Sequence, residues 1–259
     1  MNTNLKNKVV IVTGGAGLLG REFVKAILRH GGIPVIAEIN ASAAQKLQKD
    51  LQKKFPRARV DLFKLDITSK DSLQKMIRYV NGQYGRIDAL VNCAYPRNKN
   101  FGRKFEDVTY KDFCENVNLQ LGGYFLSSQQ IALYFKKQRF GHLINIASIY
   151  GVVPPRFEIY EGTNMTTAVE YGAVKSAIIA LTKYMTKYFK GTNIRFNTVS
   201  PGGIWAGQPK TFLKKYRAFC QSKGMLQAKD VVGTLLFLLS DDSQAITGQN
   251  FIVDDGFVL

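Results

Sequence analysis

Short apolar runs, rich in β-branched residues, alternate with longer amphipathic stretches along this chain. The short runs are typical of buried parallel strands, and the longer stretches have helical periodicity. Strands are expected at 8–13, 33–38, 59–66, 87–92, 142–148, 193–199 and 250–254. Helices are expected at 21–30, 41–55, 106–137, 171–190 and 229–240, with another that begins at Ser69 and ends near Gly82 and Gly85. This alternation predicts an α/β fold in which a doubly wound parallel sheet of about seven strands is flanked by helices.

The first expected strand ends in a glycine-rich turn, Thr13-Gly-Gly-Ala-Gly-Leu-Leu-Gly20, which an amphipathic stretch follows. Strand, glycine turn and helix together favour dinucleotide binding, because glycines let the backbone approach a pyrophosphate at the helix N-terminus. An ordinary strand-to-helix turn is the alternative. The next strand ends at Glu38, whose carboxylate can accept hydrogen bonds from both adenosine ribose hydroxyls and would repel a 2′-phosphate. Glu38 therefore favours NAD over NADP.

Tyr171 and Lys175 are four residues apart, so on a helix they lie on one face. A nearby cation favours the phenolate, which lets the phenol exchange a proton with a substrate hydroxyl or carbonyl. Such a pair also occurs by chance, so it needs support from elsewhere in the chain. Asp66, Asn92 and Ser148 each end an expected strand, at the edge where parallel sheets bind ligands.

The net charge of +17 can indicate binding to nucleic acid, to an anionic membrane surface or to an acidic substrate. Alternatively, it reflects Lys-rich helix faces that are exposed to solvent. No aromatic-and-basic RNA-binding motif or zinc-finger spacing is present, so we do not expect nucleic acid as a partner. The apolar run at 231–239 is too short to span a bilayer, so we do not expect a membrane either. Among the functional readings we favour a phosphorylated or nucleotide-linked substrate in a basic cleft. Three cysteines without metal-ligand spacing predict no metal site and a reducing, cytoplasmic location.

Over almost its full length the chain resembles a short-chain dehydrogenase/reductase. The resemblance rests on motifs in the family's order: Thr13-Gly14…Gly20, Asp66, Asn92-Cys-Ala94, Asn118, Ser148, Tyr171…Lys175, Asn197…Pro201-Gly202 and Thr247-Gly248…Asp254. It implies a single Rossmann domain over residues 1–259 that binds a nicotinamide cofactor. The residues it implies for the cofactor are Gly14, Gly17, Leu18, Leu19, Gly20, Glu38, Asp66, Ile67, Asn92, Ala94, Tyr171, Lys175, Pro201, Gly202 and Ile204.

The resemblance also implies a catalytic role for four residues. Tyr171 would be the general acid/base, and Lys175 would bind the nicotinamide ribose and favour the tyrosinate. Ser148 would orient the reacting oxygen, and Asn118 would hold a water that links Lys175 to solvent. In the same way Asp66 would meet the adenine ring, and Asn92 would stabilise the central strand.

Several segments depart from the family pattern. The glycine spacing is typical of larger nucleotide-sugar epimerases and dehydratases, and Tyr95 stands where the family has glycine. A loop at about 152–166 is longer than usual and is expected to contact substrate, with a surface loop as the alternative. The segment at about 203–224 is the expected substrate lid. The substrate residues expected from these departures are Tyr95, Arg97, Arg156, Glu158 and Trp205.

Details of these segments resemble a bacterial subgroup associated with flagellin and surface-polysaccharide sugars. They imply an NAD-dependent oxidoreductase acting on a secondary alcohol or ketone of an anionic sugar, in a surface-glycan or flagellin-glycosylation pathway of the legionaminic type. A sugar epimerase or dehydratase with tightly bound NAD is one alternative, and a non-catalytic NAD-binding protein is another. The family resemblance also implies a homodimer or homotetramer that packs through the helices at 106–137 and 171–190.

Overall fold

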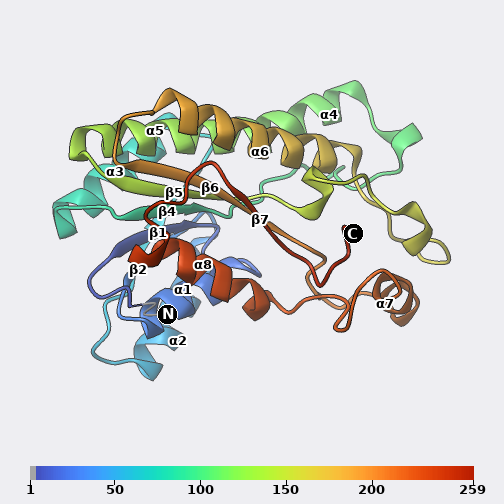
Figure 1. Cartoon of the computed structure of the whole chain (residues 1–259), viewed down its shortest axis with the longest axis horizontal. Coiled ribbons are helices and arrows are strands. Elements are labelled where there is room, and N and C mark those ends of the chain that lie inside the picture. Colours follow the sequence, from blue (N-terminus) through green and yellow to red (C-terminus); the bar gives the residue numbers. More distant parts are fainter. Residues whose placement is uncertain (1–3) are drawn as a thin grey trace.

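A seven-stranded parallel sheet runs through the middle of the protein, with helices on both faces (Figure 1). The computed structural model describes residues 4–259. The strand order is β3-β2-β1-β4-β5-β6-β7. The chain adds β2 and β3 on one side of β1 and β4 to β7 on the other, so the strand order reverses where β1 and β4 are neighbours. The strands are β1 (Val9–Thr13), β2 (Ile33–Glu38), β3 (Asp61–Lys64), β4 (Ala89–Asn92), β5 (Gly141–Ile146), β6 (Ile194–Pro201) and β7 (Asn250–Val253). The predicted fold class is confirmed, and ligands in such sheets bind where the order reverses.

Two helical layers cover the sheet (Figure 1). The helices are α1 (Gly20–Arg29), α2 (Ala41–Lys54), α3 (Lys70–Tyr84), α4 (Tyr110–Val117), α5 (Gly123–Gln138), α6 (Val169–Tyr188), α7 (Lys210–Arg217) and α8 (Val232–Leu239). On one face α1 and α8 bury Phe23 and Leu235 in a common core. On the other face α3, α5 and α6 bury Met76, Phe135 and Ile178. Burial on both faces explains why the strands read as continuous apolar runs.

The helix expected at 106–137 extends from Tyr110 to Gln138 and changes its winding once along its length. It begins at Tyr110, where the Thr109 side chain accepts a hydrogen bond from the Asp112 amide. Between α4 and α5 lies a five-residue π-helical turn, η2 (Asn118–Gly122). A π-turn inside a helix inserts extra residues and changes which side chains face the neighbouring elements. The expected helix is therefore present, but it begins at Tyr110 and has a π-turn in the region that carries Asn118.

The segment at 203–224 contains a helix that the apolar pattern did not predict. In α7 only Phe212 and Tyr216 are buried, one helical turn apart, and the remaining positions are mostly polar or basic. Two buried residues in eight are too few to define a helical stripe in the sequence. Within residues 4–259, no helix is both long and apolar enough to cross a bilayer.

Candidate active site

A cavity of about 690 Å³ opens at the carboxyl ends of the central strands. Its wall runs from the glycine turn after β1, past the ends of β2, β4 and β5, to the segment that contains α7. Most of the expected cofactor residues line it: Gly14, Gly17, Leu18, Leu19, Gly20, Glu38, Asp66, Ile67, Ala94, Tyr171, Lys175, Pro201, Gly202 and Ile204. The fold thus brings residues from six separate segments of the chain to one cavity.

The glycine turn is shaped by close backbone contacts. Gly14 has φ of 63°, and a Cβ added there would lie 2.8 Å from the Ala94 Cα. A Cβ added at Gly20 would lie 2.2 Å from the Gly14 carbonyl oxygen. Only glycine fits both positions, and the turn leaves the N-terminus of α1 at the cavity wall, where its amides can bind a pyrophosphate. The turn therefore fits a nicotinamide dinucleotide.

Two acidic side chains stand along the same end of the cavity. Glu38 accepts hydrogen bonds from the Ala16 amide, at 3.3 Å, and from the Asn40 amide, at 3.1 Å. The Asp66 carboxylate accepts from the amide and the hydroxyl of Thr68, at 2.9 and 2.6 Å. Both carboxylates are thus held by neighbouring backbone and remain at the cavity wall.

Asn92 was expected among the cofactor residues, but the structure places it beneath the cavity, fully buried. Its amide nitrogen donates to Ser128 and Asn145, at 3.2 and 3.0 Å. Its backbone carbonyl accepts from the Tyr124 hydroxyl at 2.9 Å. Asn92 thus ties β4 to α5 and β5, which is the stabilisation of the central strand that was expected of it, and its contact with the cofactor stays a prediction.

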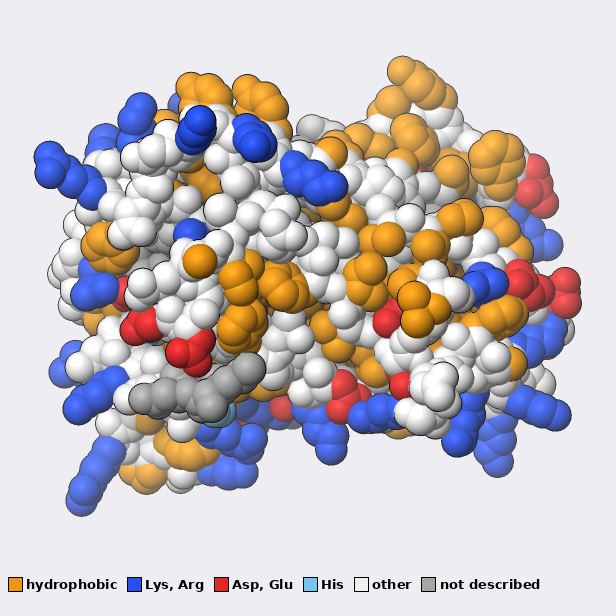
Figure 2. All heavy atoms as spheres, viewed as in Figure 1, with side chains coloured by type: hydrophobic (Ala, Val, Ile, Leu, Met, Phe, Trp, Pro, Cys, Tyr) orange, Lys and Arg blue, Asp and Glu red, His pale blue; other side chains and the backbone are white. Residues whose placement is uncertain are grey.

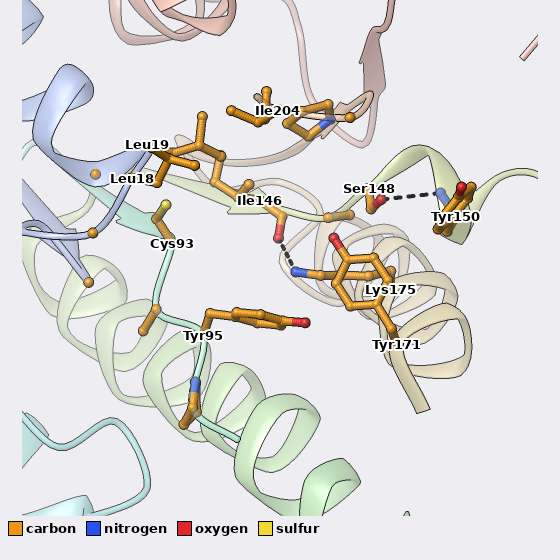
Figure 3. A pocket seen from close by; sticks show the side chains of 18 of the residues that line it. Leu18, Leu19, Cys93, Tyr95, Ile146, Ser148, Tyr150, Tyr171, Lys175 and Ile204 are labelled. Atoms are coloured by element: carbon orange, nitrogen blue, oxygen red, sulfur yellow. Dashed lines mark hydrogen bonds between the residues drawn. The ribbon is translucent and has the colours of Figure 1, made fainter. Parts of the chain in front are cut away.

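Tyr171, Lys175 and Ser148 meet at the middle of the cavity (Figure 3). The Tyr171 hydroxyl points toward Ser148, which lies two residues beyond β5. The Lys175 ammonium donates to the Ile146 carbonyl at 3.0 Å, and its nitrogen lies 5.5 Å from the centre of the Tyr171 ring. The Tyr95 ring meets the Tyr171 ring edge-on, with centroids 5.8 Å apart. The phenol is therefore held between a hydroxyl, a cation and a second aromatic ring.

Burial dominates the ionisation of this group. It raises the pKa of Tyr171, and the Ser148 hydroxyl offsets part of that rise. It lowers the pKa of Lys175 to about 8, because a charged amine is costly in a site shielded from water. The expected lowering of the Tyr171 pKa by Lys175 does not dominate here, because burial is the largest influence on that pKa and raises it. Neutral and charged forms of Lys175 are both accessible near neutral pH.

Asn118 was expected to stand with these residues, but it does not line the cavity. Its side chain is exposed, and its Oδ1 lies against Gly122 of the same turn. Gln120, two residues later, is 1% exposed. Positions two apart on a helix point to nearly opposite sides, so only one of them can face the protein interior. The inward position belongs to Gln120, which the sequence reading missed.

Of the five expected substrate residues, Tyr95 alone lines the cavity. The Arg97 guanidinium lies 5.2 Å from the centre of the Tyr95 ring on the exposed side. Arg156 stacks 4.3 Å over Phe219 and so joins its loop to the segment at 203–224. Glu158 and Trp205 are exposed and lie outside the cavity wall.

The far end of the cavity is lined mainly by the expected substrate loop and lid, through residues that were not named among the expected substrate residues. They are Tyr150, Tyr160, Met165, Thr166, Gln208, Phe212, Tyr216 and Met225. The hydroxyls of Tyr150 and Tyr160 lie 3.0 Å apart. The long loop and α7 thus contribute hydroxyls and apolar surface here. The extra length of the loop and the expected lid pointed to these two segments, but neither signal identified the individual residues.

The cavity wall is not basic. Within the described residues, Lys175 is the only lysine or arginine that lines it, beside Glu38 and Asp66. Figure 2 shows lysine and arginine side chains scattered around the periphery of the visible face. The expected basic cleft was therefore wrong, and solvated lysines and arginines account for the charge visible on that face.

Comparison with known proteins adds to this picture. A family model described as enoyl-(acyl carrier protein) reductase matches residues 15–258. The chain is 44% identical to post-translational flagellin modification protein A of Campylobacter coli, over 98% of this chain and 100% of that protein. It is 31% identical to a 3-oxoacyl-(acyl-carrier-protein) reductase of Thermotoga maritima, over 98% and 99%. The crystal structure of a short chain dehydrogenase of Leptospira borgpetersenii with bound NAD+ superposes with a TM-score of 0.84 at 30% identity, covering 100% of this chain and 95% of that one.

Proposed function

The chain belongs to the short-chain dehydrogenase/reductase family of oxidoreductases, and on that premise we propose that it uses NAD to oxidise a secondary alcohol or reduce a ketone of a sugar. One observation carries the proposal: Ser148, Tyr171 and Lys175 meet in a cavity that begins at a glycine turn. The turn and Glu38 suit the adenosine half of the cofactor, and Pro201, Gly202 and Ile204 line the same cavity beside Lys175. When bound, the nicotinamide supplies or accepts the hydride.

The protein's own residues handle the proton. In oxidation, the Tyr171 oxygen takes the proton from the substrate hydroxyl, and in reduction it returns one to the developing alkoxide. Ser148 donates a hydrogen bond to the reacting oxygen and sets its distance from the phenol. Lys175 holds positive charge beside the phenol and so stabilises the tyrosinate. Tyr95 packs against the Tyr171 ring and limits its rotation.

A sugar fits the far end of the cavity. Tyr150, Tyr160 and Thr166 offer hydroxyls to a sugar ring, while Met165 and Phe212 offer apolar surface. Because Lys175 is the only cation on the described wall, we place any phosphate or nucleotide of the substrate at the mouth, near Arg97. The 44% identity to flagellin modification protein A favours a substrate from surface-glycan or flagellin glycosylation, of the legionaminic type. The loop at 152–166 and the lid at 203–224 would then select the sugar.

We also propose that the protein forms a homodimer or homotetramer. Large side chains stand exposed on α5 and α6, among them Phe125, Leu133, Tyr184 and Tyr188. Tyr184 and Tyr188 stack on each other with centroids 6.0 Å apart and are 65% and 70% exposed. An apolar helical face of this kind is typical of a protein–protein interface. Light scattering of the purified protein would distinguish monomer, dimer and tetramer.

The test is a screen of nicotinamide absorbance over neutral sugars, sugar phosphates and nucleotide sugars. We expect NADH to appear when a secondary hydroxyl of one of these sugars is oxidised, and we expect Tyr171→Phe to abolish turnover while NADH binding survives. Near-normal turnover in Tyr171→Phe would refute the mechanism. The glycine spacing keeps an epimerase or dehydratase as the second candidate. Protein that retains NAD through purification, and converts sugar without net NADH, would favour that candidate.

A further inference from the structure

Asp255 has an unusual backbone conformation near the end of the chain. Its φ is 57°, in the left-handed region that glycine adopts readily and most other residues avoid. Aspartate can occupy this region when its short side chain makes hydrogen bonds nearby. The side chain of Asp255 bonds to the last residues of the lid, the segment at 203–224, and so makes contacts that glycine could not make.

The carboxylate of Asp255 holds the end of the lid through successive amides. Its Oδ2 accepts hydrogen bonds from the backbone amides of Ser222, Lys223 and Gly224, the first and last at 3.1 and 2.8 Å. Its Oδ1 accepts from the Ser222 hydroxyl at 3.1 Å. Successive amides that point at one place form a concave anion site. The Gly224 amide, with those of Ser222 and Lys223, holds the pKa of Asp255 below its usual range, so the carboxylate is charged at neutral pH.

Lys215, in α7, joins the lid to the long loop at 152–166. Its ammonium donates to the backbone carbonyls of Glu158 and Glu161, both at 3.0 Å, and to the Glu161 carboxylate at 3.2 Å. An ammonium has three N–H groups, so all of them are directed at this loop. Ile159, which lies between the two glutamates in the sequence, is fully buried. The loop is therefore fastened to α7 by polar contacts and by an apolar side chain.

The loop, the lid and the C-terminal residues also share one small core. Ile159, Phe212, Tyr216 and Phe257 are among its buried members. The Tyr216 ring stacks on Phe257 with centroids 4.4 Å apart, and the Phe212 ring meets Tyr160 with centroids 5.2 Å apart. Figure 1 shows the C-terminal end of the chain on the same side as α7. Because Tyr160, Phe212 and Tyr216 also line the cavity, this core supports the wall at its far end.

We propose that Asp255 and Lys215 are positioning residues that hold the lid and the loop together around the sugar end of the cavity before substrate binds. Asp255 fixes the end of the lid, and Lys215 fixes the loop to α7. A wall that is already in place needs no ordering when the sugar binds, so the two residues increase the affinity for the sugar. They also restrict which sugars fit. This inference rests on the proposed function.

Hydrogen–deuterium exchange tests the hold on the lid without a substrate. Asp255→Gly removes the acceptors while its backbone keeps the left-handed conformation easily. The amides within residues 218–226 should then exchange roughly tenfold faster or more, while those of α3 stay as in the wild type. Asp255→Asn keeps one side-chain oxygen and should retain part of the protection. Asp242→Gly makes the same replacement at an exposed aspartate outside the cavity wall and is the matched control.

The same measurement tests the link between lid and loop. Lys215→Met keeps the length of the side chain and removes its donors, so exchange within residues 156–162 should become faster. Lys214→Met, at the exposed neighbouring position, is the matched control and should leave exchange unchanged. Unchanged exchange of the lid in Asp255→Gly, or of the loop in Lys215→Met, would overturn the proposal. Circular dichroism and melting temperature would identify variants that fail to fold, and Asp255→Asn then carries the test.

A kinetic test uses the sugar that gives the highest wild-type turnover in the screen. Asp255→Gly and Lys215→Met should raise the KM for the sugar roughly fivefold or more, and leave kcat and the KM for NAD near their wild-type values. A fivefold rise means that the wall is in place for about one-fifth of the time. Asp255→Asn should give a KM between those of the wild type and Asp255→Gly.

The outcomes separate this inference from the proposed function. An unchanged KM for the sugar in both variants would overturn the inference while turnover itself stands. Equal losses of affinity for sugar and NAD would indicate general loosening of the protein and would also overturn it. If no sugar is turned over, the proposed function fails, and the exchange measurements still decide whether Asp255 and Lys215 hold the lid and the loop.

Discussion

Replacing Glu38 with glutamine should weaken the preference for NAD over NADP. The substitution removes one negative charge and keeps the shape of the side chain. In the wild type, the Glu38 carboxylate is held at the end of β2 by hydrogen bonds from the amides of Ala16 and Asn40, at 3.3 and 3.1 Å. Ala16 belongs to the glycine turn, so the carboxylate stands where the adenosine ribose of a dinucleotide would lie.

The size of the effect follows from simple electrostatics. One unit of phosphate charge about 5 Å from a carboxylate costs roughly 3 kcal/mol at an effective dielectric constant of about 20. Glu38 is only half-buried, so water and salt reduce this to about 1–2 kcal/mol, or roughly 5- to 30-fold in relative affinity. Arg21 adds to the change: it donates to the Ala16 and Gly17 carbonyls and stays beside the turn once the carboxylate charge is gone.

The assay is a fluorescence titration of wild type and Glu38→Gln with NADH and NADPH, at low and moderate salt. We expect the Kd for NADPH divided by the Kd for NADH to fall roughly tenfold in the variant. This difference between variant and wild type should shrink at higher salt. Glu106→Gln, an exposed glutamate outside the cavity wall, is the control for the general loss of charge. Tighter binding of NADPH than NADH by the wild type, or an unchanged ratio in Glu38→Gln, would refute this reading of Glu38.

Two further predictions concern stability. Gly20→Ala places a Cβ 2.2 Å from the Gly14 carbonyl oxygen, so it should cost about 1–3 kcal/mol and weaken NADH binding, whereas Gly82→Ala has open space in α3 and should stabilise slightly. A wild-type melting temperature and NADH affinity in Gly20→Ala would contradict this. Burial, with Arg195 beside it, holds the pKa of His142 well below its usual range. Below about pH 6.5 the unfolded chain therefore binds a proton that the folded protein does not, so the free energy of unfolding should fall by up to about 1.4 kcal/mol per pH unit. Denaturant titrations at several pH values should show a shallower acid slope for His142→Gln, and identical slopes would contradict the prediction.

The sequence by itself determined the sheet, the glycine turn and the pairing of Tyr171 with Lys175. These features are local: a buried parallel strand needs a short apolar run, and a shared helix face needs a spacing of four. The positions of Glu38 and Ser148 followed from the same logic, because each stands at or just beyond the carboxyl end of a strand. Residues whose place depends only on their own element could thus be assigned without the structure.

Only the tertiary structure decided which side chains turn into the cavity between the elements. Arg156 and Trp205 looked like substrate residues, yet the packing of the lid directs Arg156 onto Phe219 and leaves Trp205 exposed. The π-turn η2 is the clearest case: the sequence pointed to Asn118, and the fold buries Gln120. Each residue along a helix is rotated by about 100° from the one before it, so two positions turn a side chain from the interior to the solvent. The hydrophobic pattern of one helix does not set that rotation, because it depends on how the helix packs against its neighbours.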